Sequence, residues 1–394
     1  MRAALLGALL SLIVGVGTAH ACSCVRAHPA NMLSQAQAAI VGVVETRDAG
    51  PNGALSYAVR VERALKGTFD ERVTVHSGLT SCQVSLQVGA RVGLFLHAGA
   101  LGEWTGSTCG LVDPDALLAA ADLPAPRGSA RFVAAVQSPA TDAIALTASG
   151  KPAGYALPQG TMAQARCGGR LVAAGRSGGK LRVFSRGLPG LDAFGAVTIP
   201  LRNVLALGCT GQTIWAAGTD GLVKVRGTQV QRVRRIDASA ATIAGGRAYF
   251  ATRGAVKVVT LATNRLRTVR HKGQFGQLSV NDGRVAGYLQ TGGAAILSGA
   301  TNRRAGLLTW LDGRHLLDST RGLVLDTRLR TVRRGVKGTV LAVEDGAAYV
   351  AQGNVVRRLK SGATRATVFA RLPGKVVALT VTPPTAAAAW HSCE

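Results

Sequence analysis

The chain of 394 residues is two to three times the usual length of one domain, so at least two units are expected. Hydrophobic residues make up 47% and charged residues 17%, with 50 glycines against 13 prolines, which excludes a disordered linker or a coiled coil. The formal charge of +26 is uneven: residues 22–122 carry 7 Lys/Arg and 9 Asp/Glu, whereas residues 123–394 carry 38 and 11, a balance of +27. Such a basic region attracts polyanions such as teichoic acids, phospholipid head groups or acidic glycans. An arginine-rich composition also follows from GC-rich coding, so the charge alone does not establish a function.

Residues 1–21 have the pattern of a signal peptide. Arg2 gives a positive start, residues 3–17 are uncharged and apolar, and the tripeptide 19–21 (AHA) places small residues where signal peptidase reads them. We expect cleavage after Ala21. A lipoprotein signal also ends before a cysteine, but it prefers a larger aliphatic residue where Ala19 stands. No later stretch is long and apolar enough to span a membrane, so the protein is expected to be secreted or extracytoplasmic, in the cell envelope.

Four of the seven cysteines lie before residue 110, and they are expected to form disulfides outside the cytoplasm. Cys22 and Cys24 are too close for a CxxC metal pair and have no supporting histidine, so no metal site is predicted. Together with Cys82 and Cys109 they allow three pairings, and the spacing does not choose among them.

Between residues 22 and 122 the pattern predicts a small β-barrel with a helix near each end. Residues 29–31 (PAN) are expected to open a first helix over 32–38, with Asn31 as a candidate cap. Buried or alternating runs predict strands over 39–46, 56–65, 72–76 and 91–98. The closing helix is expected over 113–121, with Asp113 as cap and Pro114 at its first position.

This stretch resembles the netrin-like module, an OB-type barrel also found in tissue inhibitors of metalloproteinases. The resemblance is carried by the Cys-x-Cys start, by IVGVVE and YAVRVERALKG, and by SCQVSLQVGARVGLFL and STCG, all within residues 22–122. It implies disulfides between Cys22 and Cys82 and between Cys24 and Cys109.

In those inhibitors the α-amine and carbonyl of the first cysteine chelate the protease zinc, and a small hydroxyl residue beside it enters the specificity pocket. Cys22 and Ser23 match these positions. The third disulfide and the second domain of the inhibitors are missing from this sequence. A terminus braced for structural reasons explains the same four cysteines.

Residues 123–129 (LPAPRGS) have the composition of a linker, and residues 130–394 are repetitive. Six units, each a strand, a short turn and a strand, align on Gly169, Gly211, Gly246, Gly283, Gly313 and Gly346, with spacings of 42, 35, 37, 30 and 33. Hairpins at this period without helices predict a β-propeller. The unassigned ends, 132–146 and 376–390, would pair in a seventh blade and close the ring, with six or eight blades as alternatives.

Cys167 and Cys209 each stand two residues before an anchor glycine, so they occupy equivalent positions on neighbouring blades. A disulfide between them is predicted. Cys393 is then left as a free thiol or as the partner in an intermolecular bond.

No HExxH, Walker A or GxGxxG motif occurs in the sequence, and residues 175–179 (GRSGG) match GxSxG only within an expected hairpin turn. We therefore expect an all-β protein with no catalytic activity and no cofactor. Basic clusters at 302–304, 328–334 and 357–358 are interpreted as solvated strand faces, and with 4% aromatic residues nucleic acid is not expected as a partner.

The favoured function is binding of a protein or an anionic envelope polymer through the basic propeller. The alternative is inhibition of a metalloprotease through the Cys22 amine and carbonyl. A third and weaker alternative is a propeller hydrolase or lyase with residues of an unrecognised pattern. The sequence predicts neither the oligomeric state nor the identity of the partner.

Overall fold

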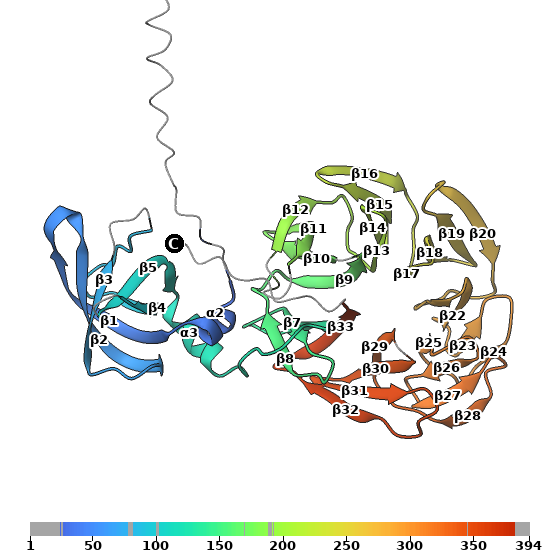
Figure 1. Cartoon of the computed structure of the whole chain (residues 1–394). Helices are drawn as coiled ribbons and strands as arrows, with labels where there is room; N and C mark the ends of the chain where they lie inside the picture. The colour runs from blue at the N-terminus through green and yellow to red at the C-terminus, as the bar shows by residue number, and fades with distance from the viewer. Residues whose placement is uncertain are drawn as a thin grey trace, which may run out of the picture. The chain divides into compact units, whose positions relative to one another are not determined.

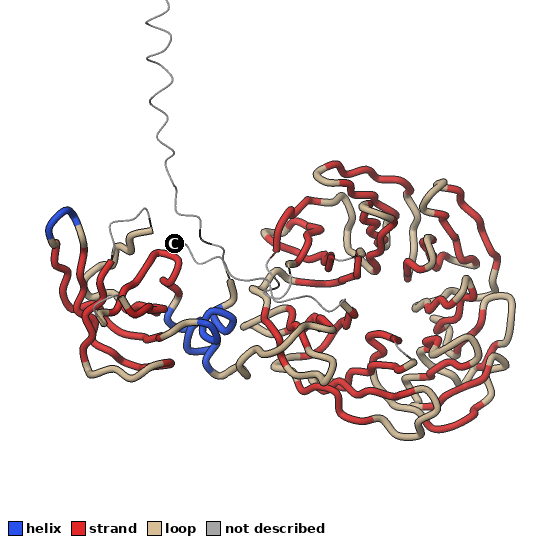
Figure 2. The backbone as a smooth tube through the Cα atoms, in the orientation of Figure 1, coloured by secondary structure: helices blue, strands red, loops and turns tan. Residues whose placement is uncertain are grey.

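The computed structural model describes residues 24, 27–77, 82–99, 102–168, 170–187, 191, 193–344 and 346–382. The chain divides into two compact units, one ending at Ala121 and the other beginning at Asp122. Strands dominate both units, so the protein is all-β (Figure 2). Within the described ranges, no helix has the length and apolar character needed to cross a membrane. The expected signal peptide, Cys22, Ser23 and Cys393 lie outside the described residues.

The first unit is a closed barrel of five strands in the order β1-β2-β3-β5-β4, with β3 and β5 parallel and the other pairs antiparallel. This Greek-key arrangement is that of an OB-type barrel. The strands are β1 (Ala38–Ala49), β2 (Leu55–Lys66), β3 (Arg72–Ser77), β4 (Arg91–Ala98) and β5 (Trp104–Val112), with a short 3-10 helix η1 (Pro51–Gly53) between the first two.

The first half of strand β1 is buried because both of its faces are covered there, whereas its last four residues are exposed. Ile40 and Val44 point into the barrel core with Val59 and Leu94. Ala39 and Val41 belong to a second apolar cluster that includes residues of both helices, α2 (Pro29–Gln35) and α3 (Pro114–Ala121). Buried Tyr57 ties the segment after β3 to the barrel, since its hydroxyl donates to the Val84 carbonyl and accepts from the Leu86 amide.

The first helix is capped at an earlier residue than predicted, and it ends at Gln35 and not at Ala38. It starts at Pro29, and its N-cap is His28, whose Nδ1 accepts a hydrogen bond from the Ala30 amide at 3.1 Å. Asn31 is therefore not the cap; it lies inside the helix and is buried. The closing helix is as predicted, because Pro114 is its first residue and the Asp113 carboxylate accepts from the Ala116 amide at 2.8 Å.

The second unit is a β-propeller of seven four-stranded blades arranged in a ring (Figure 1). Blade 1 contains β9 (Thr161–Cys167), β10 (Arg170–Ser177), β11 (Lys180–Arg186) and β12 (Ala193–Thr198). The next two blades are β13 (Ala206–Thr210), β14 (Thr213–Gly218), β15 (Gly221–Arg226) and β16 (Gln229–Arg234), followed by β17 (Ala240–Ala244), β18 (Arg247–Thr252), β19 (Ala255–Thr260) and β20 (Arg265–Arg270).

Blades 4 and 5 are β21 (Ser279–Asn281), β22 (Arg284–Tyr288), β23 (Ala294–Ile296) and β24 (Thr301–Asn302), then β25 (Leu308–Trp310), β26 (His315–Asp318), β27 (Leu323–Asp326) and β28 (Thr331–Arg334). Blade 6 is β29 (Thr339–Glu344), β30 (Ala347–Gln352), β31 (Val355–Lys360) and β32 (Thr367–Arg371). The seventh, or closing, blade joins β33 (Lys375–Val381) to β6 (Phe132–Gln137), β7 (Ala143–Leu146) and β8 (Pro152–Tyr155).

The ring closes as the sequence analysis expects, by pairing the two ends of the propeller. Strand β33 runs antiparallel to β6, with Val376 opposite Val136 and Val381 opposite Phe132. The repeat glycines from Gly211 to Gly346 lie in the turns between the first and second strands of their blades. Gly211 and Gly346, for example, have φ of 57° and 67°, which a residue with a Cβ adopts only at a cost.

The position of a strand within its blade determines its composition. Second strands such as β10 and β18 are buried over most of their length because neighbouring blades cover both faces. Outer strands such as β16 and β20 are largely exposed and rich in arginine. Charge on an unpaired edge discourages pairing with another chain, which is a structural reason for part of the basic composition.

Candidate functional site

The two ends of the propeller are built from different connections. In each blade the turn between the second and third strands lies at the same end as the crossover from one blade to the next, because successive strands are antiparallel. Hydrogen bonds confirm this proximity: the Ala238 amide donates to the Thr219 carbonyl at 2.8 Å, and the Gly338 amide donates to the Ser319 carbonyl at 2.9 Å. We call this the crossover end and the opposite one the hairpin end.

The crossover end carries many exposed cations. The basic residues in its turns and crossovers are all exposed; they are Arg202, Arg235, Arg253, Lys272, Arg303, Arg304, Arg321 and Lys337. Of the acidic residues there, Asp220 is paired with Arg232 at 3.2 Å and Asp142 is buried, whereas Asp237 is exposed. The positive charge of this end is therefore largely left facing solvent.

Asp142 and Arg186 form a buried ion pair between the closing blade and blade 1. Arg186 Nη2 lies 2.8 Å from Asp142 Oδ1, and the two side chains are 0% and 8% exposed. Asp142 Oδ2 also accepts from the amides of Gln159 and Thr161 and from the Thr161 hydroxyl. This carboxylate joins two blades and is not available to a ligand.

The hairpin end is less uniformly basic. Among the described residues its turns carry Asp282 and Asp312, and exposed cations at Lys151, Arg314, Arg328, Arg330 and Arg365. Hydrogen bonds to its carboxylate, chiefly from the Arg330 amide, hold the pKa of Asp326 below its ordinary value.

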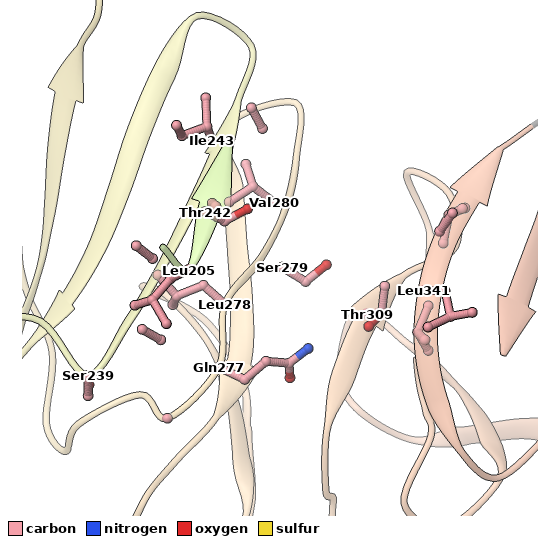
Figure 3. A pocket seen from close by; sticks show the side chains of 18 residues that line it. Leu205, Ser239, Thr242, Ile243, Gln277, Leu278, Ser279, Val280, Thr309 and Leu341 are labelled. Atoms are coloured by element: carbon pink, nitrogen blue, oxygen red, sulfur yellow. The ribbon is translucent and has the colours of Figure 1, made fainter. Parts of the chain in front are cut away.

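A cavity of about 680 Å³ lies among the first strands of several blades, near the axis of the ring (Figure 3). Its lining residues come chiefly from β17, β21 and β29, and none of them is charged. Figure 3 shows Gln277 and Ser279 on one side of the cavity and Thr309 and Leu341 on the other. The apolar, hydroxyl and amide side chains of this lining give the cavity no charge with which to attract a polyanion.

The predicted cysteine sites are distributed over both units. Cys24 is bonded to Cys109, the pair implied by the netrin-like resemblance, and Cys167 is bonded to Cys209. Cys82 is also a disulfide cysteine. The predicted bond from Cys22 to Cys82 and the predicted protease contact of Cys22 and Ser23 lie outside the described residues and stay predictions.

The bond between Cys167 and Cys209 joins β9 to β13, the first strands of neighbouring blades, at the hairpin end. It therefore lies away from the basic crossover end. The GxSxG match ends in the turn between β10 and β11, where Gly178 and Gly179 have φ of 56° and 73°. In the part of the chain that the structure describes, no three His, Cys, Asp or Glu side chains come together as a metal site would require.

The basic clusters were predicted to be solvated strand faces, and the grouping of Arg303 and Arg304 with cations of other segments at the crossover end was not predicted. Arg321 lies in a turn and Lys337 in a crossover, and only the order and direction of the strands in each blade place both residues at the same end. An assignment of each basic residue to a turn or a crossover in the repeat alignment would have supplied this signal.

No family model matches the chain, and no curated protein matches it. Similar solved structures include BamB from Moraxella catarrhalis, with 16% identity over 53% of this chain and 75% of that chain and a TM-score of 0.38. The WD40 domain of Toxoplasma gondii coronin has 11% identity over 63% and 73% of the two chains and a TM-score of 0.40. Kuenenia stuttgartiensis hydrazine synthase has 12% identity over 57% and 87%, with a TM-score of 0.39. The propeller assignment here therefore rests on the strand pairing of this chain itself.

Proposed function

We propose that this protein is a non-enzymatic binding protein of the cell envelope, secreted or extracytoplasmic, whose propeller binds an anionic polymer or an anionic protein surface. The observation that carries the proposal is the set of exposed cations at the crossover end. Of the acidic residues in its turns and crossovers, Asp142 and Asp220 are engaged in structural contacts and only Asp237 is exposed among the described residues. A field of one sign raises the local concentration of an oppositely charged partner and steers its approach.

The two disulfides between described cysteines support a location outside the cytoplasm, because such bonds persist in oxidising compartments. In this proposal the mature chain begins at Cys22 after removal of residues 1–21. N-terminal sequencing of protein from the extracytoplasmic fraction tests this part. A chain that still begins at Met1 would contradict it.

The binding proposal is tested with the full mature chain and soluble long-chain polyphosphate, with neutral dextran as the control polymer. Binding to polyphosphate should persist at about 0.15 M salt and weaken steeply above it, because exposed charges are screened over about 8 Å at that ionic strength. Equal binding to both polymers, or affinity independent of salt, would overturn the proposal.

A second candidate function is metalloprotease inhibition by the barrel through Cys22 and Ser23. The bond from Cys24 to Cys109 favours it, since that pairing is the one implied by the inhibitor-like module. The test is inhibition of a zinc protease by the mature protein before and after acetylation of its α-amine. Inhibition that survives acetylation, or none before it, would exclude this candidate.

A further inference from the structure

Four cations of blade 5 and its two flanking crossovers lie close together at the crossover end. We call Arg303, Arg304, Arg321 and Lys337 the cation cluster. Arg321 Nη1 donates to the Arg304 carbonyl at 3.3 Å, which places the turn after β26 against the crossover before β25. On the other side of this turn, a Cβ built on Gly322 would lie 3.0 Å from Lys337 Cγ. One turn thus brings three segments of the chain together, each with a cation.

The carboxylate nearest to these segments in the chain, that of Asp318, is directed inward. Asp318 is 0% exposed, and its two oxygens accept hydrogen bonds from the Gly306 amide at 3.0 Å and the Arg321 amide at 3.1 Å. Among the described residues, none of the four cations forms an ion pair with a carboxylate. The charge of the cluster is therefore exposed, and no described carboxylate forms an ion pair with it.

Several backbone amides beside the cluster are already hydrogen-bonded within the protein. The Leu307 amide donates to Thr320 Oγ1 at 3.0 Å, and the Arg304 amide donates to Asn302 Oδ1 at 2.9 Å. A partner would accordingly be held by the mobile ends of long side chains and not by a rigid cradle of amides. Such a surface suits a flexible polyanion with repeated charges better than a single small anion of fixed shape.

The composition of the cluster also bears on the class of partner. Three segments carry the cluster, 303–307, 319–322 and 335–338, and none of the large exposed hydrophobic residues lies in them, whereas peripheral membrane binding normally adds apolar insertion to charge. The same three segments contain no aromatic side chain on which a nucleic acid base would stack. Arginine recognises phosphate in a bidentate manner, and three of the four cations are arginine.

We propose that the cation cluster is the docking surface for a flexible phosphate-bearing polymer, in which successive phosphates contact Arg303, Arg304, Arg321 and Lys337. This inference rests on the proposed function and specifies the surface and the class of partner.

The test compares two triple variants of the full mature chain that have the same change in charge. R303Q/R304Q/R321Q removes three cations of the cluster. R226Q/R314Q/R365Q removes three exposed arginines at the hairpin end whose side chains form no ion pair or hydrogen bond with another described residue. Binding of long-chain polyphosphate is measured by fluorescence titration over a series of salt concentrations, after circular dichroism has shown that both variants are folded.

We expect the cluster variant to bind about a hundredfold more weakly at low salt, because each cation beside an anionic surface contributes about fivefold. The slope of log affinity against log salt should fall by about three, one for each lost phosphate contact. The hairpin-end variant should lose about threefold or less. R303K/R304K/R321K should retain most of the salt slope because it keeps the charge.

Equal losses in the two triple variants would overturn the cluster while leaving the proposed function intact. Failure of the unaltered protein to prefer polyphosphate over dextran would overturn the proposed function itself. A third outcome is tight binding to vesicles containing phosphatidylglycerol that the cluster variant weakens, together with weak binding to polyphosphate. This outcome would identify a membrane surface as the partner and overturn this inference.

Discussion

Removal of the Asp142 carboxylate should destabilise the propeller strongly. In D142A, Arg186 keeps its charge at a site where its side chain is 0% exposed, and loses a partner at 2.8 Å. A buried charge left without its partner costs about 3–5 kcal/mol. The amides of Gln159 and Thr161, which donate to Asp142 at 2.7 and 3.0 Å, lose an acceptor as well. We expect D142A to lower the free energy of unfolding by about 4 kcal/mol or more.

The assay is urea unfolding followed by circular dichroism, with the midpoint and the slope fitted together. R330Q is the control, because it breaks an exposed pair with Asp326 at 4.0 Å and should cost about 1 kcal/mol or less. D142A/R186M removes both charges and should regain much of the stability lost in D142A. A loss in D142A no larger than that in R330Q would refute the reasoning, and so would a double variant less stable than D142A.

Three further predictions concern other parts of the structure. C167A/C209A should lower the free energy of unfolding by up to about 4 kcal/mol, since the disulfide closes a loop with a sequence separation of 42 residues. Unfolding with and without a reductant measures this loss, and an unchanged midpoint would contradict the prediction. G221A should lower the free energy of unfolding clearly more than G211A, because Gly221 has φ of 142° and a Cβ there would lie 2.1 Å from the Arg234 carbonyl oxygen, whereas a Cβ at Gly211 would meet open space. Equal losses in the same assay would count against this steric explanation. Burial raises the pKa of the Tyr155 phenol, so the folded state favours the neutral phenol. The stability that this preference contributes is present below about pH 10 and is lost as the pH rises further. Ultraviolet titration of the wild type against Y155F should show that Tyr155 ionises at higher pH than an exposed tyrosine, and ionisation near pH 10 would refute this.

The repeat pattern predicted the propeller because six of the blades contribute the same signal, a glycine turn between two strand-like runs. The closing blade was predicted from the need to pair two leftover ends, and β33 and β6 do so. The barrel was predicted less completely. Strand β5 was missed because glycines at 106 and 110 weaken the alternating pattern.

Packing explains these glycines. A Cβ at Gly110 would lie 2.7 Å from the Phe95 carbonyl oxygen, and one at Gly106 would lie 3.0 Å from Val75 Cγ1. At these two positions β5 approaches β4 and β3 closely. In the sequence alone, the same glycines only lower the predicted tendency to form a strand. The first helix was placed too late for a similar reason, since His28 is an uncommon cap and its role depends on where its ring nitrogen points.

Closure of the ring by β33 has a consequence for how the chain acquires its structure. Synthesis proceeds from the N-terminus, so β6, β7 and β8 emerge long before the strand that completes their sheet. The backbone bond from the Thr382 amide to the Arg131 carbonyl joins residues at the two ends of the propeller sequence. Until Lys375–Val381 arrives, the inner edge of β6 is an open template on which another nascent chain can pair. A product truncated before residue 375 would keep that edge permanently, and we would expect it to associate with other chains or be degraded while the barrel folds normally.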